Sequence, residues 1–416
     1  MIMSRYRNLF KKIMKFDFKE FSYPEKPLSQ KKIGFRLEKI LKNLKSRNLD
    51  HKIGEPHFFP NPIAVSFWSK FLAKSPNQLG NWSIKGEIKL HGTHEIEREV
   101  IYDMISLLKG DQEELEGYIT SGATEGNIFS AWIGRKSLEK NVSKESICLV
   151  RSDLTHYSIT KAADIIGVPD FITPLDENKW NISIIFFIKT IMELYKKGYK
   201  GFLIPFTLGY TVGGTNDDYE EIIKQIRALK NKFDDIHFFT WIDAAFSGLT
   251  IPFLKDNFMP FSNPFIQTFI LDFHKVAGVP YPAGLVLYKK NLRQLIEKDI
   301  PYLNRKDNTL LGSRTAAAPI AIWATINYIG KRNMKKIIQE CLKQKQQFLK
   351  TVEKRFKSVR SITDENSTQA ALLIKNPLPQ DFCRRYGLTL NHQNIKIGEK
   401  SFKAKLYKLF FLPRFK

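Results

Sequence analysis

The sequence contains little cysteine, since Cys148, Cys341 and Cys383 are the only three in 416 residues and lie far apart. It has no CxxC pair and no cysteine–histidine cluster with metal-ligand spacing, which argues against a disulfide framework or a structural zinc site. It also lacks an apolar run close to the ~20 residues of a membrane-spanning helix, and the longest apolar segment, residues 181–195, carries a lysine and a glutamate. We therefore expect a soluble, cytoplasmic protein without a metal.

The N-terminal residues 1–21 are basic but lack the apolar core and the cleavage site of a secretory signal. They can form an amphipathic helix that lies on a partner subunit or on a membrane surface, and of these we favour the subunit. Acidic residues are also too few to balance the bases, which leaves a formal net charge of +24. The lysines are scattered, and no RGG tract, zinc finger or RNP-like motif accompanies them, so we do not expect nucleic acid as the main partner.

The order of predicted elements indicates an α/β protein. Residues 1–77 form a helix-prone arm, and short β-rich runs alternate with helical patterns through a large domain at residues 78–300. Such alternation predicts a mostly parallel sheet with helices on both faces and a ligand at the carboxyl ends of the strands. Residues 301–416 change to long lysine-rich helices with two short strand candidates, at 370–377 and 393–397, and predict a small α+β domain.

The segment "GYITSGATEGN", residues 117–127, reads as a strand that turns into a helix through small residues. A helix N-terminus offers unpaired N–H groups to an anion, and small side chains let the anion approach. Small residues also form ordinary strand-to-helix turns, so the segment alone leaves both interpretations open. The anion-binding interpretation concerns Ser121, Gly122, Ala123 and Thr124.

Three further residues stand at the predicted ends of strands or starts of helices. His156 precedes the helical pattern "YSITKAADII", where it can point into a crevice at the sheet edge, although a lone histidine can also be structural. Asp243 ends the apolar run "HFFTWID", and a buried carboxylate is costly unless it is paired. Lys275 ends "TFILDFHK", where partial desolvation would favour the neutral amine that forms an imine with a carbonyl.

Taken in this order, the turn, the histidine, the aspartate and the lysine match what pyridoxal 5′-phosphate requires. The turn holds the phosphate, the histidine covers one ring face, the aspartate pairs with the pyridine nitrogen, and the lysine forms the Schiff base. The sequence therefore predicts a site for this cofactor.

The same motifs resemble those of the group II pyridoxal-phosphate-dependent decarboxylases, most closely the bacterial histidine decarboxylases. The resemblance is collinear over residues 78–325 and includes "NQLGNW", "THEIEREV" and "LLGSRTAAAPIAIW". It implies an aspartate-aminotransferase-like fold (fold type I). It also implies that an L-amino acid, with histidine or another aromatic one favoured, loses CO2 through an external aldimine to give an amine.

The resemblance assigns a role to individual residues. Lys275 would form the Schiff base, Asp243 would hold the pyridine nitrogen, and Ala245 would pack against the ring. His156 would stack over the other face and contact the substrate. The remaining implied cofactor contacts are Ala123, Thr124 and His274 at the phosphate, Thr207 near the ring, and Ser313 at the phosphate of the neighbouring subunit. A homodimer with shared active sites is thus expected.

Three residues differ from the family pattern. In the loop after Lys275, Ala283 stands where related histidine decarboxylases tend to have Cys. Relatives carry Ser or Asn at the position of Asp272, and a carboxylate repels a phosphate dianion unless it points away, is protonated or pairs with a cation. Tyr210 replaces a usual Thr.

Two other functions remain open. One is a pyridoxal-phosphate-dependent carbon–carbon lyase of the sphingosine-phosphate lyase type, and the other is a catalytically idle basic binding protein.

Overall fold

The computed structural model describes residues 24–45, 52–54, 59–83, 93–301 and 305–414. The chain forms two compact units, Met1–Lys52 and Ile53–Lys416. In the first unit the described residues include one helix, α2 (Gln30–Lys45). The helix expected within residues 1–21 lies outside the described residues. The expected domain boundaries after residues 77 and 300 stay predictions.

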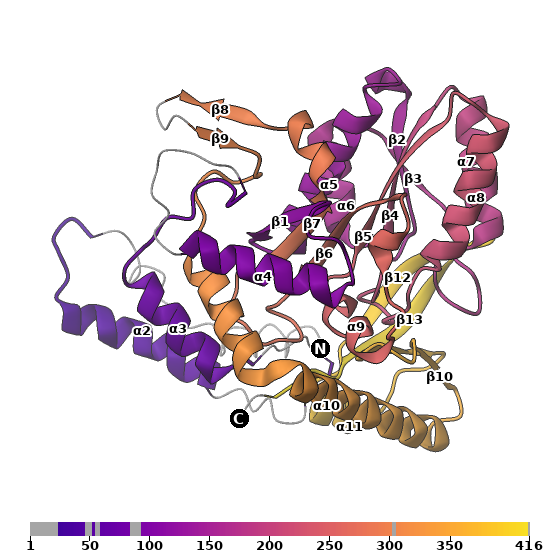
Figure 1. Cartoon of the computed structure of the whole chain (residues 1–416). Helices are drawn as coiled ribbons and strands as arrows, with labels where there is room; N and C mark the ends of the chain where they lie inside the picture. The colour runs from indigo at the N-terminus through magenta and orange to yellow at the C-terminus, as the bar shows by residue number, and fades with distance from the viewer. Residues whose placement is uncertain (1–23, 46–51, 55–58, 84–92, 302–304, 415–416) are drawn as a thin grey trace. The chain divides into compact units, whose positions relative to one another are not determined.

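The second unit is built around a seven-stranded sheet in the order β1-β7-β6-β5-β4-β2-β3 (Figure 1). Strand β7 pairs antiparallel with β1 and β6, and the other neighbours pair in parallel. The strands are β1 (Leu115–Thr120), β2 (Ile147–Arg151), β3 (Asp170–Ile172), β4 (Gly201–Thr207), β5 (His237–Asp243), β6 (Ile266–Asp272) and β7 (Gly284–Lys289). The predicted mostly parallel sheet is confirmed.

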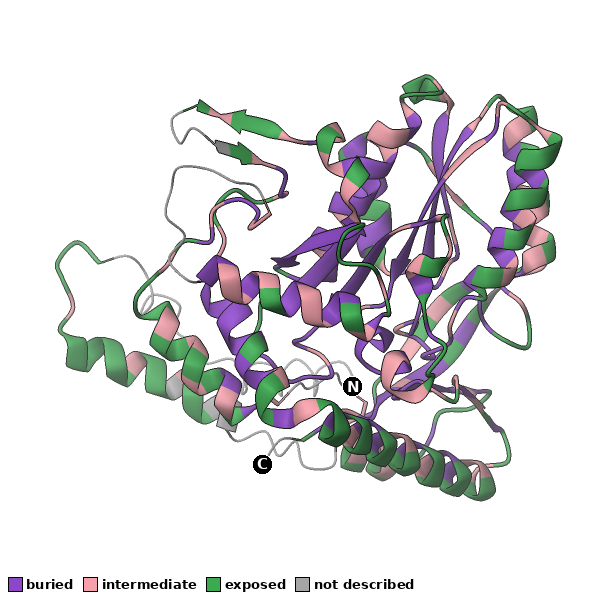
Figure 2. Ribbon diagram, in the orientation of Figure 1, coloured by how far each residue is buried: buried purple, intermediate pink, exposed green. Residues whose placement is uncertain are grey.

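Helices cover both faces of this sheet, so most residues of its central strands are buried (Figure 2). Alternate residues of one strand enter different cores, as Leu203 of β4 packs in one cluster and its neighbours Phe202 and Ile204 pack in the other. This double burial explains why the strands read as continuous apolar runs. Helices α5 (Ala123–Leu138) and α6 (Tyr157–Ile166) cover the first face, and α4 (Thr93–Leu107), α7 (Ile184–Lys196) and α8 (Tyr219–Lys232) cover the second.

The C-terminal part contains the second, smaller sheet that was expected of an α+β domain. Its four antiparallel strands run in the order β10-β11-β13-β12 and pack with α11 (Gln380–Tyr386). The two predicted strand segments correspond to β11 and β12, whereas β10 and β13 were not predicted. The strands are β10 (Val359–Ile362), β11 (Gln369–Ile374), β12 (Leu390–Ile397) and β13 (Lys400–Phe410), and a separate hairpin joins β8 (Lys298–Ile300) to β9 (Arg305–Asp307).

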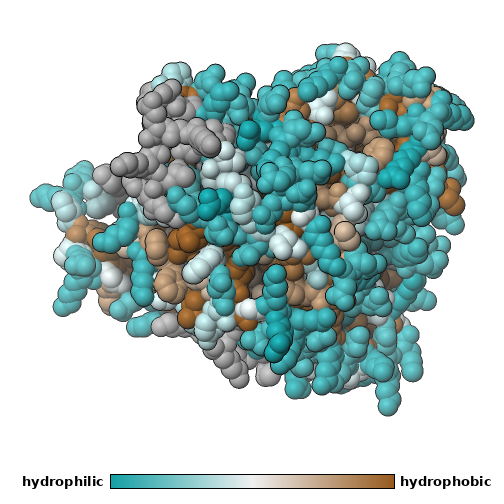
Figure 3. Space-filling model, viewed as in Figure 1, coloured by the Kyte–Doolittle hydropathy of each residue, from teal (hydrophilic) through white to brown (hydrophobic). Residues whose placement is uncertain are grey.

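Helix α10 (Ala317–Arg355) leads from the large sheet to the small one and changes direction at Gly330 (Figure 1). The φ of 70° and ψ of 156° at Gly330 are not helical and belong to a region that only glycine readily adopts. The helix packs against α4 and against α3 (Pro62–Leu72). Apolar side chains gather over α3 and α10 on the face seen in Figure 3. The exposed apolar residues of these two helices include Phe67, Trp323 and Tyr328.

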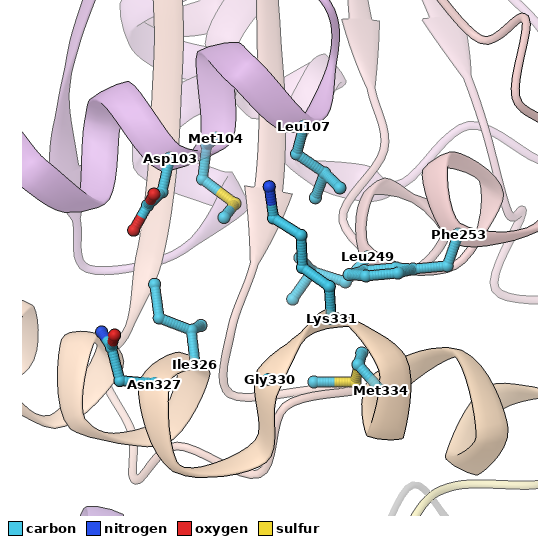
Figure 4. A pocket seen from close by; sticks show the side chains of 10 residues that line it. All are labelled: Asp103, Met104, Leu107, Leu249, Phe253, Ile326, Asn327, Gly330, Lys331 and Met334. Carbon is cyan, nitrogen blue, oxygen red and sulfur yellow. The ribbon is translucent and has the colours of Figure 1, made fainter.

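A cavity of about 210 Å³ opens beside Gly330, between α10, α4 and the short helix α9 (Ile251–Leu254) (Figure 4). Apolar side chains such as Met104 and Phe253 form most of its wall, and Asp103 and Lys331 stand at its edge. In the described part of the chain, no helix combines the length and the apolar character needed to cross a membrane.

Candidate functional site

The candidate site is a cavity of about 420 Å³ at the carboxyl ends of β4, β5 and β6. It lies where parallel α/β sheets bind their ligands. All the residues predicted for the site except Ser313 line this cavity. They are Ser121, Gly122, Ala123, Thr124, His156, Thr207, Asp243, Ala245, His274 and Lys275.

The predicted turn stands at the N-terminus of α5, with Gly122 as the N-cap at a φ of 144°. A Cβ at this position would come within 3.2 Å of Cε1 of His274, so the turn and the histidine are in close contact. The Ser121 N–H donates to Oε2 of Glu125 over 2.6 Å, and the Ala123 N–H donates to Oδ1 of Asp272 over 2.8 Å. Carboxylates of the chain itself therefore take two of the N–H groups at this helix end.

Asp243 is 4% exposed at the end of β5. Its Oδ2 accepts a hydrogen bond of 2.7 Å from the side-chain amide of Asn127, and its Oδ1 accepts one of 3.1 Å from the Ala245 N–H. The amide of Asn127 is oriented by the indole of Trp241, which donates to Asn127 Oδ1 over 3.1 Å. The buried carboxylate thus has the partners that its burial requires.

His156 is the N-cap of α6 and faces the same cavity. Its Nδ1 lies 2.8 Å from Oγ of Ser158, which in turn accepts a hydrogen bond of 3.0 Å from Asn127. Burial lowers the pKa of His156, an effect that the charge of Asp243 opposes and that of Lys275 reinforces. The ring is therefore neutral at neutral pH, and its Nδ1 edge is fixed by Ser158.

Lys275 pairs with Asp272 in the cavity wall, with 3.1 Å between Nζ and Oδ2. The ammonium also lies 4.0 Å from the centre of the Phe246 ring. His274 Nε2 lies 3.3 Å from the same Oδ2. Burial by itself raises the pKa of Asp272, but the charges of Lys275 and His274 outweigh it and hold that pKa below its usual value. The carboxylate that departs from the family pattern is thus charged and paired with Lys275.

Thr207 at the end of β4 and Gly209 and Thr211 in the following loop line the cavity, whereas Tyr210 does not. The Tyr210 hydroxyl is buried, donates to Asp217 over 2.8 Å and accepts from Ser152 over 2.9 Å. The tyrosine that departs from the family pattern therefore supports the loop from behind. Oγ1 of Thr207 is buried without a hydrogen-bond partner among the described residues.

Ser313 does not line the cavity that the described residues of its own chain form. It is exposed, and its Oγ accepts a hydrogen bond of 3.1 Å from the side chain of Asn77. The side chain of the following residue, Arg314, is 5% exposed and donates to both oxygens of Glu97 and to the carbonyl of Ile119. This ion pair fixes the Ser313 loop to α4 and β1.

Several residues of the site were not predicted. Asn127 lies one helical turn after Ala123, and this spacing on one helix face was a signal that could have found it. Tyr157 and Ser158 stand in the first turn of α6, and the others come from loops whose course the sequence does not fix. Besides Asn127, the residues that were not predicted are Leu154, Tyr157, Gly209, Thr211, Phe246 and Tyr281, which line the cavity, and Ser158 behind it.

Comparisons with known proteins point to one family. Residues 92–371 match the model of the pyridoxal-dependent decarboxylase conserved domain. The chain is 32% identical to a tryptophan decarboxylase of Clostridium sporogenes over 263 residues, which span 62% of each chain and thus less than two thirds of that relative. It is 30% identical to a histidine decarboxylase of Morganella morganii over 278 residues, 66% of this chain and 69% of the relative.

The fold has solved counterparts. The crystal structure of L-methionine decarboxylase from Streptomyces sp. 590 superposes with a TM-score of 0.81 and covers 96% of this chain and 95% of its own, at 17% identity. At this identity the likeness establishes the fold alone. The expected fold type I is confirmed.

Proposed function

The chain belongs to the pyridoxal-dependent decarboxylase family, and on that premise we propose that it decarboxylates an L-amino acid with pyridoxal 5′-phosphate. Histidine or another aromatic amino acid is the favoured substrate. The tryptophan and histidine decarboxylases among its relatives support this choice, as do the aromatic side chains of Tyr157, Phe246 and Tyr281 on the cavity wall. The observation that carries the proposal is the presence of Lys275, Asp243 and His156 in one cavity.

The residues present fit the cofactor. Lys275 supplies an amine inside the cavity, and Asp243 supplies a buried carboxylate whose orientation is fixed by Asn127. Thr207 Oγ1, which is buried without a partner among the described residues, offers a polar contact that a ligand would use. In this proposal Ser121, Gly122, Ala123, Thr124 and His274 hold the phosphate, and Ala245 and His156 lie on either side of the ring.

When bound, pyridoxal phosphate supplies an electron sink for the pair released as the bond between Cα and the carboxylate breaks. Asp243 would keep a proton on the ring nitrogen, because its buried charge favours a cationic partner. The neutral ring of His156 would orient the substrate, and the contact between its Nδ1 and Ser158 fixes the position of the ring. Lys275 would bind the cofactor and return to it after release of the amine.

We also propose a homodimer in which Ser313 reaches the site of the neighbouring subunit. Ser313 is exposed and lies outside the cavity of its own chain as described, while Arg314 fixes its loop. Exposed apolar side chains on α3 and α10 offer a surface that a second copy could cover. They include Val65, Phe67, Leu72, Trp323 and Tyr328.

The test is a titration of the purified chain with pyridoxal phosphate, followed by a screen of amino acids for released CO2. We expect a yellow protein whose visible absorption is lost on Lys275→Ala and kept on Lys140→Ala, which removes an exposed lysine after α5. Release of CO2 with an amine product rejects the carbon–carbon lyase. A protein that stays colourless with added cofactor rejects the proposed function.

A further inference from the structure

Asp272 occupies the place at which the N-terminus of α5 offers its N–H groups to an anion. Its Oδ1 accepts the Ala123 N–H over 2.8 Å at the first residue of a helix of 16 residues. The side chain is 3% exposed and lies on the wall of the cavity. The chain therefore supplies its own anion at the helix end that the proposed function assigns to a phosphate.

The second oxygen of Asp272 contacts the lysine and the histidine of the same site. Lys275 Nζ lies 3.1 Å from Oδ2, and His274 Nε2 lies 3.3 Å from it. One carboxylate thus contacts a backbone donor, the lysine and the histidine together. Its charge also acts on Tyr281, whose ring centre lies 4.2 Å from that of His274. Burial raises the pKa of Tyr281 to about 12, and the charge of Asp272 adds to that rise.

The surrounding backbone prevents Asp272 from moving away. Asp272 pairs with Gly284 in the sheet, and a Cβ at Gly284 would lie 2.7 Å from Oδ1 of Asp272 and 2.5 Å from Cα of Gly122. The carboxylate is therefore enclosed between β7 and the turn before α5. A phosphate that binds at this turn meets a negative charge that stays in place, and the two anions repel each other.

We propose that Asp272 is a fixed internal competitor for the phosphate of the cofactor, so that it weakens binding of the phosphorylated cofactor and reduces its preference over unphosphorylated pyridoxal. The inference rests on the proposed function. Asp272 acts on two groups, the phosphate and the Lys275 amine, and the two effects are separable. An effect on the amine changes the affinity for both forms of the cofactor equally. An effect on the phosphate changes the affinity for pyridoxal phosphate and leaves that for pyridoxal unchanged.

The experiment compares the full-length chain, stripped of cofactor, with Asp272→Asn. The amide keeps an oxygen for the Ala123 N–H and removes the charge. Each protein is titrated with pyridoxal phosphate and with pyridoxal, followed by absorption, and inorganic phosphate is tested as a competitor of the former. Asp103→Asn, in the cavity of Figure 4, removes one negative charge away from the site and serves as the matched control.

For Asp272→Asn we expect the ratio of the two dissociation constants, pyridoxal over pyridoxal phosphate, to rise by about tenfold or more, the order expected for removing a unit charge beside a dianion at a partly buried site. Inorganic phosphate should also compete at lower concentration, and Asp103→Asn should leave both values unchanged. An unchanged ratio would show that Asp272 acts through Lys275 alone and would overturn the inference. If neither protein binds either form, the proposed function itself fails.

Discussion

The side-chain amide of Asn127 donates to the carboxylate of Asp243 over 2.7 Å. Its second hydrogen goes to Ser158 Oγ, which lies 2.8 Å from His156 Nδ1. One residue of α5 therefore orients both the carboxylate and the histidine of the proposed site. Because Trp241 donates to the amide oxygen, the direction of this amide is fixed.

Asn127→Ala should lower the free energy of unfolding by about 1–3 kcal/mol, because it leaves buried polar atoms of Asp243 and Trp241 without partners. The variant should also bind pyridoxal phosphate more weakly, since Asp243 loses its orientation. Urea unfolding and cofactor titration measure the two effects. Asn141→Ala, at an exposed position after α5, is the control and should stay within about 0.5 kcal/mol of the parent. Equal stability of the two variants would contradict the prediction.

The pKa of His156 should lie below its ordinary 6.5, because burial disfavours the charged ring. Asp243→Asn should lower this pKa further, and Lys275→Met should raise it, because the two charges act in opposite directions. NMR titration of the imidazole in the cofactor-free chain measures each shift. Since the folded pKa is depressed, the neutral ring contributes stability above its ordinary pKa, and this contribution is lost as the pH falls through the folded value. Shifts of the same sign in both variants would refute the electrostatic account.

The site residues that could be predicted from the sequence are those near the end of a strand or the start of a helix. Asp243 ends β5, His156 is the N-cap of α6, and Lys275 lies in the turn three residues after the end of β6. A parallel sheet brings strand ends together without any knowledge of loops. Phe246 and Tyr281 were missed because they enter the cavity from loops whose course depends on tertiary packing. The hydrogen bond between Asp272 and Ala123 could not be predicted from the sequence either, because the two residues are 149 positions apart and only the fold brings them together.

Strand β13 was missed for a different reason. Its segment "KSFKAKLYKLF" carries a lysine at every second or third position, which is unusual for a strand of a packed sheet. In the structure these lysines alternate with buried residues such as Ala404 and Leu406. The period of two was present in the sequence, and the charge obscured it.

Arg314→Met should lower the free energy of unfolding by about 3–5 kcal/mol, because it leaves the buried carboxylate of Glu97 without its cation. Glu97 is fully buried, and Arg314 also donates to the backbone carbonyls of Ile119 and Gly80. Chemical unfolding measures the loss. The double variant Arg314→Met with Glu97→Gln should recover part of it, because no charge is then left unpaired. A double variant less stable than Arg314→Met would contradict this explanation.

The proposed sharing of the site between subunits predicts complementation. Lys275→Ala and Ser313→Glu should each reduce decarboxylation, the second because a carboxylate would face the neighbour's phosphate. A mixed dimer contains one site with both native residues, so co-assembly at equal amounts should restore about a quarter of the parent activity. Activity assays on the unfractionated co-expressed dimers measure this recovery, and purified dually tagged dimers, which are all mixed, should have about half of the parent activity. Were Ser313 to act in its own subunit, the mixed dimer would hold no additional intact site and activity would not recover.

Substitution of Gly330 by alanine tests whether the change of direction in α10 depends on backbone conformation alone. An ideal Cβ at this position meets no described atom within 4 Å, so Gly330→Ala introduces no steric contact, yet it forces alanine into a φ of 70° and a ψ of 156°. This strain should lower the free energy of unfolding by about 1–3 kcal/mol. Gly312→Ala is a matched control, because its Cβ also meets no described atom and its φ is not in the positive range. Thermal unfolding should separate the two variants. If they are equally stable, the helix tolerates a different path at residue 330, and the glycine is not required for the turn toward the small sheet.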